Sequence, residues 1–174
     1  MVSSLDGMIA SNDNSVSWFE TSHYYDKGVI SEDPEEFLKA IDCYIMGSKT
    51  YELAMDLSKE YGWAYGDKPI IVLTNRKLHT DKQNIEFYSG DLFLLVNERL
   101  RTTYKSVWVV GGSMISNEFI RLKLADEIHL SILPLILSDG LPFFKRMDQE
   151  QKLQLKDAKA YNNGMVELSY EIIK

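Results

Sequence analysis

Three short apolar runs constrain the fold of this chain more than any other feature of its sequence. They are CYIM (43–46), PIIVL (69–73) and VWVV (107–110), and none of them alternates with polar residues. A strand that is covered on both faces reads as a continuous apolar run, as in a parallel sheet with helices on each side. The runs therefore predict strands in the parallel centre of an α/β protein.

Helical patterns lie between these runs. Asp33-Pro34-Glu35-Glu36 predicts a helix start, with Asp as N-cap, Pro in the first turn and Glu at the third position. Apolar side chains also recur on one helical face in residues 48–58, 91–104 and 113–123. We expect these helices to cover the parallel strands.

The C-terminal third alternates apolar with polar residues instead. MVELSYEII (165–173) and KLQLK (152–156) both alternate, and the Asn-Gly pair within 162–164 is a strong hairpin signal. EIHLSILPLIL (127–137) predicts a long strand that Pro134 interrupts, which indicates an edge or a bulge there. We therefore expect one α/β domain over residues 1–174, with an antiparallel C-terminal hairpin on the same sheet as the parallel strands.

The first ten residues, MVSSLDGMIA, look like the end of a strand that runs into a loop. A central strand usually has several more apolar residues than the two that precede Ser3. This suggests that the natural chain begins further upstream.

Size and charge exclude several classes of function. The 174 residues, 45% of them hydrophobic, are enough for one domain with a full core. The formal net charge is −7, so the chain is a poor nucleic-acid binder, because the phosphate backbone requires a basic face. An anionic ligand requires basic residues that are concentrated locally.

Cysteine and histidine usage argues against metal sites and disulfides. Cys43 is the single cysteine, and it begins an apolar run, so we expect a buried and inert thiol. The three histidines are scattered, and His129 lies in a strand pattern, where we expect hydrogen bonds within the sheet. With neither a membrane-length apolar run nor a signal peptide, we expect a cytoplasmic protein without a membrane partner.

Two strand ends lead through glycine and a small polar residue into a helix. CYIMGSKTYE places Gly47 before Ser48, Lys49 and Thr50, and VWVVGGSMIS places Gly111 and Gly112 before Ser113. In open α/β sheets ligands bind beyond the carboxyl ends of the strands, and a helix N-terminus suits phosphate. We call these two strand-to-helix connections the glycine crossings. If their strands are near neighbours, we expect both crossings to contact a pyrophosphate, with hydroxyl donors from Ser48, Thr50 and Ser113.

The remaining apolar run ends in LTNRK (73–77). Thr74, Asn75, Arg76 and Lys77, with Lys49, form a local basic cluster in an acidic chain. A guanidinium matches a phosphate monoester, and the 2′-phosphate of NADPH is the natural ligand. The alternative is a tight turn at each glycine and a solvated loop at the basic cluster. Neither a G-x-G-x-x-G fingerprint nor a phosphate-binding P-loop motif is present.

Five motifs in order cover nearly the whole chain: SLDGMIA, IMGSKTYE, PIIVLTNR, VWVVGGSMISNEFI and LADEIHLSILPLILSDGLPFF. Together they resemble the dihydrofolate reductase-like domain at the C-terminus of the bifunctional riboflavin-biosynthesis deaminase/reductase, especially its stand-alone bacterial relatives. The resemblance implies a three-layer fold with a mainly parallel central sheet and helices on both faces. It also implies a homodimer, for which LPLILSDGLPFF supplies apolar contacts.

The resemblance also implies roles for particular residues. The coenzyme phosphates would contact Gly47, Ser48, Lys49 and Thr50, the 2′-phosphate end would contact Thr74, Asn75 and Arg76, and the pyrophosphate and nicotinamide side would contact Gly111, Gly112, Ser113 and Met114. The substrate and nicotinamide would face Asp6, Gly7 and Ile9. Relatives often have Arg where Ser48 stands and Gly where Ser113 stands. The loss of that Arg removes a phosphate clamp, which weakens the expected preference for NADPH over NADH, and Lys49 offers a point charge in place of a forked guanidinium.

The reaction implied by the resemblance is hydride transfer from NADPH, which also requires a proton donor. The candidates are Asp6 and, within SWFETSHYYDKG (17–28), Glu20, His23, Tyr24 and Asp26. Trp18 would stack on a flat substrate or, as we favour, pack in the core.

We therefore expect an NADPH-dependent reductase of a small heterocyclic or ribosyl-aminopyrimidine substrate. It would be similar to 5-amino-6-(5-phosphoribosylamino)uracil reductase and would belong to riboflavin biosynthesis. The alternatives are a true dihydrofolate reductase and a nucleotide-binding sensor module without turnover.

Overall fold

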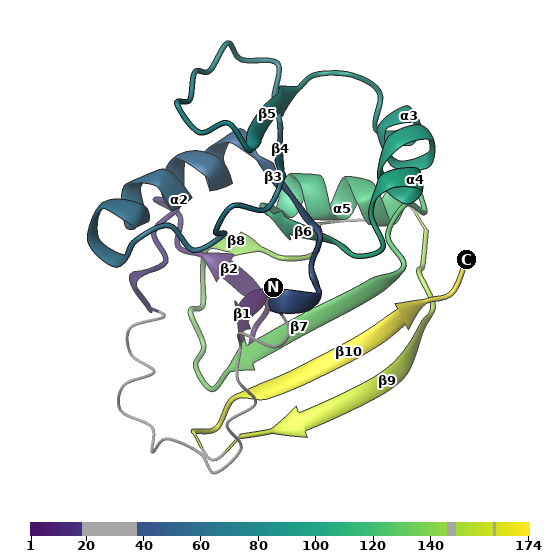
Figure 1. Ribbon diagram of the computed structural model, residues 1–174. Helices are drawn as coiled ribbons and strands as arrows, with labels where there is room; N and C mark the ends of the chain where they lie inside the picture. Colours follow the sequence, from purple (N-terminus) through teal and green to yellow (C-terminus); the bar gives the residue numbers. More distant parts are fainter. Residues whose placement is uncertain (19–37, 146–148, 162) are drawn as a thin grey trace. The chain divides into compact units, whose positions relative to one another are not determined.

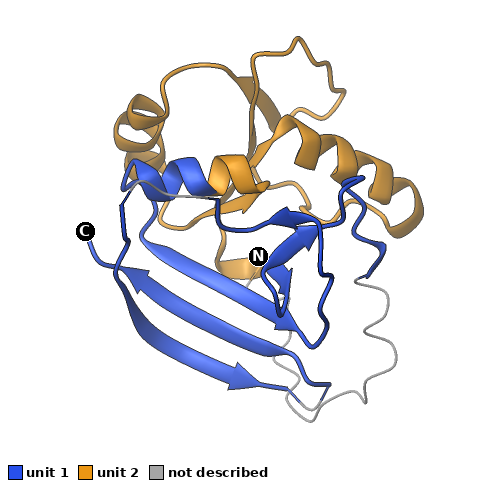
Figure 2. Cartoon of the chain, turned by 180° about the vertical axis from the view of Figure 1, so that it is seen from behind, with its two compact units in different colours: residues 1–32, 117–174 blue, residues 33–116 orange. Residues whose placement is uncertain are grey.

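The computed structural model describes residues 1–18, 38–145, 149–161 and 163–174 (Figure 1). The chain divides into two compact units, which Figure 2 colours separately. Unit 1 combines residues 1–32 with residues 117–174, and unit 2 is residues 33–116. The helix start expected at residues 33–36 lies outside the described residues.

Unit 2 contains a four-stranded sheet in which every neighbouring pair is parallel. In spatial order its strands are β5 (Ile85–Tyr88), β4 (Ile70–Leu73), β3 (Cys43–Gly47) and β6 (Val107–Gly111). The three apolar runs are thus adjacent parallel strands, as their composition predicts. Every residue of β3 and β4 is buried, whereas β6 lies at an edge of this sheet and only Gly111 in it is fully buried, so full burial of the third run is wrong.

The core of unit 2 lies between this sheet and α2 (Ser48–Tyr61), which contacts β3 and β4. Tyr44, Met46 and Val72 are at most 2% exposed. Tyr51 of α2 packs its ring edge-on against Phe87 of β5, with 5.6 Å between the centroids. α2 begins at the residue after the end of β3, and its buried face packs it against the sheet.

Cys43 opens β3 and is completely buried. Burial raises the pKa of its thiol to about 11, because the thiolate is disfavoured away from water. The expected burial of this cysteine is confirmed, and the raised pKa favours the inert thiol that the sequence predicts.

The predicted helix over 91–104 is a helical segment that widens in its middle. It consists of α3 (Leu92–Leu94), the π-helix η2 (Leu95–Leu100) and α4 (Arg101–Thr103). The side chains of Leu95, Val96 and Leu100 are buried, as the helical face predicts. The wider turn keeps Leu100 on the same side as Leu95, five residues earlier.

Unit 1 contains a second four-stranded sheet. Its strands, in spatial order, are β1 (Val2–Ser4), β7 (Glu127–Leu133), β10 (Val166–Ile172) and β9 (Leu153–Ala160). β1 is parallel to β7, and the other two pairs are antiparallel. A short antiparallel pair, β2 (Met8–Ala10) with β8 (Leu141–Pro142), completes this unit's strands among the described residues.

The antiparallel C-terminal hairpin is confirmed, but its predicted position on the parallel sheet is wrong. β10 pairs with β7 and β9, so the hairpin extends the second sheet rather than β5-β4-β3-β6. The predicted interruption at Pro134 is confirmed: β7 ends at Leu133, since proline lacks the N–H that would continue the ladder. The suggested edge position is wrong, because β7 is an inner strand between β1 and β10.

Edge strand β9 carries a bulge. Leu155 pairs with Tyr170 and Asp157 pairs with Ser169, which leaves Lys156 without a partner on β10. Such a bulge, with lysines along the edge, discourages a further strand from pairing there.

A second core cluster in unit 1 joins Ile128 of β7 and Ile172 of β10 to Phe143 and Ile120. Ile120 lies in α5 (Ser113–Arg121). On the opposite, polar side of β7, His129 contacts Glu127 through Nε2 at 3.0 Å and Ser169 through Nδ1 at 2.9 Å. The hydrogen-bonded role expected for His129 is confirmed.

No helix among the described residues is long and apolar enough to cross a membrane.

Candidate functional site

The parallel sheet of unit 2 brings three predicted ligand-binding segments to one edge. Gly47 at the end of β3 is in register with Leu73 at the end of β4, and Met46 is in register with Gly111 at the end of β6. Because the strands are parallel and adjacent, the segments that follow them, 47–50, 74–76 and 111–114, emerge at the same edge. The neighbouring strands assumed for the two glycine crossings are therefore confirmed.

The two glycine crossings also touch each other. A Cβ on Gly47 would lie 3.2 Å from Cγ1 of Ile115, so the end of β3 and the first turn of α5 are in close contact. A Cβ on Gly112 would meet only the Thr50 hydroxyl, at 3.5 Å. Gly111 has a φ of 127°, which side chains rarely adopt, and its peptide bond to Gly112 is cis. Close packing is enough to explain why residue 47 is glycine, and backbone conformation is enough to explain why residue 111 is glycine. Neither reason applies to Gly112, which has space around it.

The first turn of α2 is suited to an anion. Its N-cap is Gly47, which provides no capping side chain, and the first turn contains no acidic residue. The amide groups at the start of an α-helix have no partner within the helix and carry a partial positive charge. Ser48, Lys49 and Thr50 occupy this turn, whereas Ser113 at the start of α5 is buried.

The basic segment after β4 is organised by its own hydrogen bonds. The backbone N–H of Arg76 donates to Oγ1 of Thr74 at 3.0 Å, and the backbone N–H of Thr74 donates to the carbonyl of Tyr88 at 2.9 Å. These bonds fix the turn in which Thr74, Asn75 and Arg76 leave the sheet.

The guanidinium of Arg76 is paired with a carboxylate that the sequence analysis missed. Nη1 and Nη2 of Arg76 donate to the two carboxylate oxygens of Glu52 on α2, at 2.9 and 2.7 Å. The hydrogen bonds from Arg76 lower the pKa of Glu52, and the nearby charge of Lys49 contributes in the same direction. The only available sequence signal is that Glu52 lies one turn into the helix that begins at the expected phosphate contact.

Asp6, a candidate proton donor, holds two loops of unit 1 together. Its carboxylate accepts hydrogen bonds from Oγ of Ser4 at 2.5 Å and from the backbone N–H groups of Leu137 and Ser138 at 3.1 and 2.8 Å. The Ser4 bond is the largest of the causes that lower the pKa of Asp6. A carboxylate that is kept ionised is a poor acid near neutral pH, so this geometry favours a structural role.

The other candidates in unit 1 divide into packed and undescribed residues. Ile9 packs against the core of unit 1, and Trp18 is only 7% exposed, as the packing interpretation of Trp18 predicts. Their contact with a substrate stays a prediction. Glu20, His23, Tyr24 and Asp26 lie outside the described residues.

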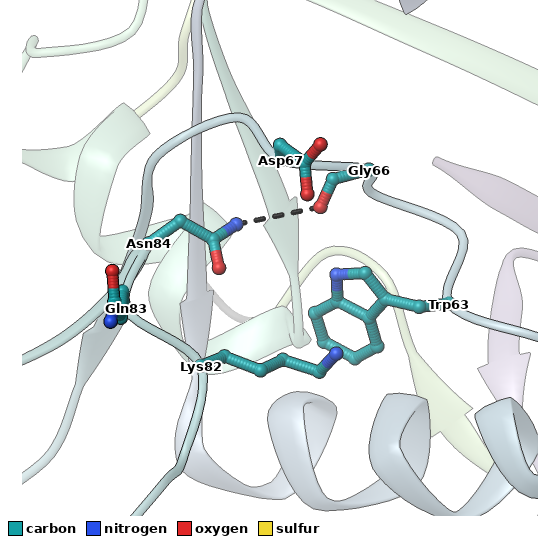
Figure 3. A pocket seen from close by; sticks show the side chains of 6 residues that line it. All are labelled: Trp63, Gly66, Asp67, Lys82, Gln83 and Asn84. Atoms are coloured by element: carbon teal, nitrogen blue, oxygen red, sulfur yellow. Dashed lines mark hydrogen bonds between the residues drawn. The ribbon is translucent and has the colours of Figure 1, made fainter.

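A separate pocket in unit 2, with a volume of about 550 Å³, contains none of the predicted site residues. Figure 3 shows the Lys82 side chain extended toward the Trp63 indole, with 4.9 Å between the ammonium and the ring centroid. Asn84 donates to the carbonyls of Gly66 and Lys68, which holds the loop before β4 to the start of β5. These contacts hold together the loops that line the pocket.

The parallel sheet with its glycine crossings, together with the antiparallel C-terminal strands, defines an α/β protein of the dihydrofolate reductase-like class. Residues 1–167 match the family described as the RibD C-terminal domain, and the chain belongs to that family.

Two known proteins are similar to this chain over nearly its whole length. The uncharacterized protein YwjB of Bacillus subtilis (strain 168) is 28% identical over 167 residues, which cover 96% of this chain and 92% of YwjB. A crystal structure of a riboflavin biosynthesis protein from Shewanella sp. PV-4, described as putative, has a TM-score of 0.84 at 20% identity and covers 100% of this chain and 97% of its own.

A longer relative contains the same fold in about half its length. The diaminohydroxyphosphoribosylaminopyrimidine deaminase/5-amino-6-(5-phosphoribosylamino)uracil reductase of Thermotoga maritima has a TM-score of 0.68 at 16% identity. The match covers 99% of this chain and 55% of that protein. At such identities the two crystal structures show the fold alone.

Proposed function

We propose that this protein is an NADPH-dependent reductase that transfers a hydride to a small heterocyclic or ribosyl-aminopyrimidine substrate. The observation that carries the proposal is the meeting of residues 47–50, 74–76 and 111–114 beyond three adjacent parallel strands. Membership of a family of reductase-like domains supports the same reaction class.

The residues at this edge fit the anionic part of a dinucleotide. The uncapped start of α2 offers backbone N–H groups to a phosphate, and Gly112 leaves the backbone before α5 accessible. Arg76 and Lys49 supply positive charge where the 2′-phosphate would lie, with Thr74 and Asn75 as hydrogen-bonding neighbours. NADPH, when bound, supplies the hydride, and the protein orients it.

The proposed substrate class is taken from a protein of the same fold. The Thermotoga maritima protein is described as a reductase of 5-amino-6-(5-phosphoribosylamino)uracil, and we propose a related substrate and a link to riboflavin biosynthesis for this chain. We also propose that the protein acts as a homodimer.

Thermal unfolding with coenzyme tests the proposal. A coenzyme that binds the folded state raises the midpoint by mass action, and NADPH should do so at lower concentration than a nucleotide without a nicotinamide. Oxidation of NADPH should then follow with the ribosyl-aminopyrimidine that is the substrate of the Thermotoga maritima reductase.

The result also separates the alternatives. Oxidation with dihydrofolate alone would show a dihydrofolate reductase, and binding without oxidation of either substrate would show a sensor module. A midpoint that neither NADPH nor NADH changes would overturn the proposed coenzyme site.

A further inference from the structure

Glu52 occupies one complete edge of the guanidinium that is proposed to recognise the 2′-phosphate. Both terminal nitrogens of Arg76 donate to it, at 2.9 and 2.7 Å, so the end-on fork of Arg76 is closed by a carboxylate. The two side chains are 55% and 43% exposed, so solvent and a ligand can both reach the pair.

Glu52 has charged neighbours of both signs on its own helix. Lys49 lies three residues before Glu52 on α2, and Asp56 lies four residues after it, so the three side chains share one helical face. The charges of Lys49 and Asp56 act on the ionisation of Glu52 in opposite directions. The basic cluster that the sequence predicts is therefore flanked by acidic side chains of α2.

We propose that Glu52 determines coenzyme specificity by competing with the 2′-phosphate of NADPH for Arg76, which narrows the preference for NADPH over NADH. This inference rests on the proposed function and refines its coenzyme site.

The competition follows from the donors that Arg76 has left. A guanidinium has five N–H donors, and the pair with Glu52 uses one on each terminal nitrogen. A phosphate must either displace the carboxylate from the end-on fork or bind at the Nε edge beside it. In both cases an ionised Glu52 stays close to a dianion and repels it.

NADH does not meet this repulsion, because it carries a neutral 2′-hydroxyl where NADPH carries the phosphate. The Glu52 charge should therefore affect one coenzyme and not the other. Since the pair is exposed and screened, the effect should be moderate and should shrink as salt is added.

The test compares dissociation constants for NADPH and NADH in the wild type and in Glu52→Gln. Glutamine keeps the length of the side chain and removes its charge. We expect roughly three- to tenfold tighter NADPH binding and NADH binding within about twofold of the wild type, at low salt. Glu52→Ala should also bind NADPH more tightly relative to NADH than the wild type does. This second variant shows whether the effect comes from loss of the charge or from the introduced glutamine.

Glu86→Gln is the matched control. Arg99 donates through Nη1 and Nη2 to the two oxygens of Glu86, at 2.7 and 2.5 Å, and the side chains are 43% and 45% exposed. This variant removes an equivalent pair at a strand residue outside the three ligand-binding segments, so its NADPH-to-NADH ratio should equal that of the wild type.

Two results would overturn the inference and leave the proposed function standing. An unchanged ratio in Glu52→Gln would show that the carboxylate does not compete. Weaker NADPH binding would show that Glu52 instead holds Arg76 in place for the phosphate. Failure of the wild type to bind either coenzyme would overturn the proposed function itself, and this inference with it.

Discussion

The hydroxyl of Thr50 lies 3.5 Å from the point that a Cβ on Gly112 would occupy, so the first turn of α2 and the backbone before α5 are neighbours. No other atom lies within 4 Å of that point outside the adjacent residues. A methyl group can therefore be added at Gly112 at ordinary contact distance, whereas a longer side chain would extend into the space proposed for the coenzyme.

Gly112→Leu should thus keep the fold and lose coenzyme binding. We expect circular dichroism like that of the wild type and a thermal midpoint that NADPH no longer raises. Gly112→Ala is the control and should keep most of the NADPH effect. An undiminished NADPH effect in Gly112→Leu would show that the coenzyme does not approach this backbone.

Arg76→Ala should weaken NADPH far more than NADH. Charge-assisted hydrogen bonds to a phosphate contribute about 1.5–3 kcal/mol, which corresponds to roughly ten- to a hundredfold in the dissociation constant. Titration with both coenzymes measures the ratio, and Arg99→Ala, which breaks the other bidentate pair, is the control. Equal losses for NADPH and NADH would mean that Arg76 does not recognise the 2′-phosphate.

Asp42 should make stability depend on pH in the acid range. Its Oδ2 accepts hydrogen bonds from the backbone N–H groups of Lys105 and Ser106, at 2.9 and 3.0 Å, which join the starts of β3 and β6. The Ser106 bond is the main cause of the lowered pKa of Asp42.

Because the folded-state pKa of Asp42 is depressed, its contribution is fully present above the unfolded value of 3.8 and is lost as pH falls through the folded value. Asp42→Asn should be less stable than the wild type near neutral pH, and urea unfolding should show this difference shrinking at acid pH. A difference that is constant with pH would contradict the role of the charge.

Asp6→Asn should reduce stability rather than change the pH dependence of turnover. The carboxylate is engaged by Ser4, Leu137 and Ser138, and its pKa is lowered, so it does not hold a proton near neutrality. We expect a lower thermal midpoint and an unshifted pH profile of NADPH oxidation. If the variant lost the part of the pH profile that reports a required protonated group, Asp6 would instead be identified as the proton donor.

The expected homodimer can be tested at exposed apolar residues of LPLILSDGLPFF. Ile136 is 66% exposed and Phe144 is 46% exposed, which is unusual for large apolar side chains unless a partner covers them. Light scattering should give a dimer for the wild type and a monomer for Ile136→Lys. Leu57→Lys on α2, at a side chain that is 42% exposed, is the control and should stay dimeric.

Local sequence patterns were sufficient to predict three of the four strands of the parallel sheet and the segments at their ends. The runs around Tyr44, Ile71 and Val109 are uninterrupted apolar residues, and this pattern needs no knowledge of distant neighbours. β5 was not predicted, because it is short and contains Glu86, which pairs with Arg99 at the surface.

Long-range pairing explains what the sequence left open. Glu52 and Arg76 are separated by 24 positions, and no periodicity connects them. The choice of β7 rather than the parallel sheet as the partner of β10 is likewise a contact between distant segments, in which Leu168 meets Leu130. The proposed coenzyme contacts and proton donors stay predictions, since they depend on bound molecules.

The burial of Cys43 has a practical consequence. A maleimide dye reacts with a cysteine that is both ionised and accessible. The raised pKa of this single cysteine disfavours the thiolate, and its full burial keeps the dye out in the folded protein. One cysteine introduced at a surface position, such as Tyr61→Cys, would then take the fluorophore alone. The native cysteine therefore does not need to be removed before the protein is labelled at one site for fluorescence measurements of ligand binding.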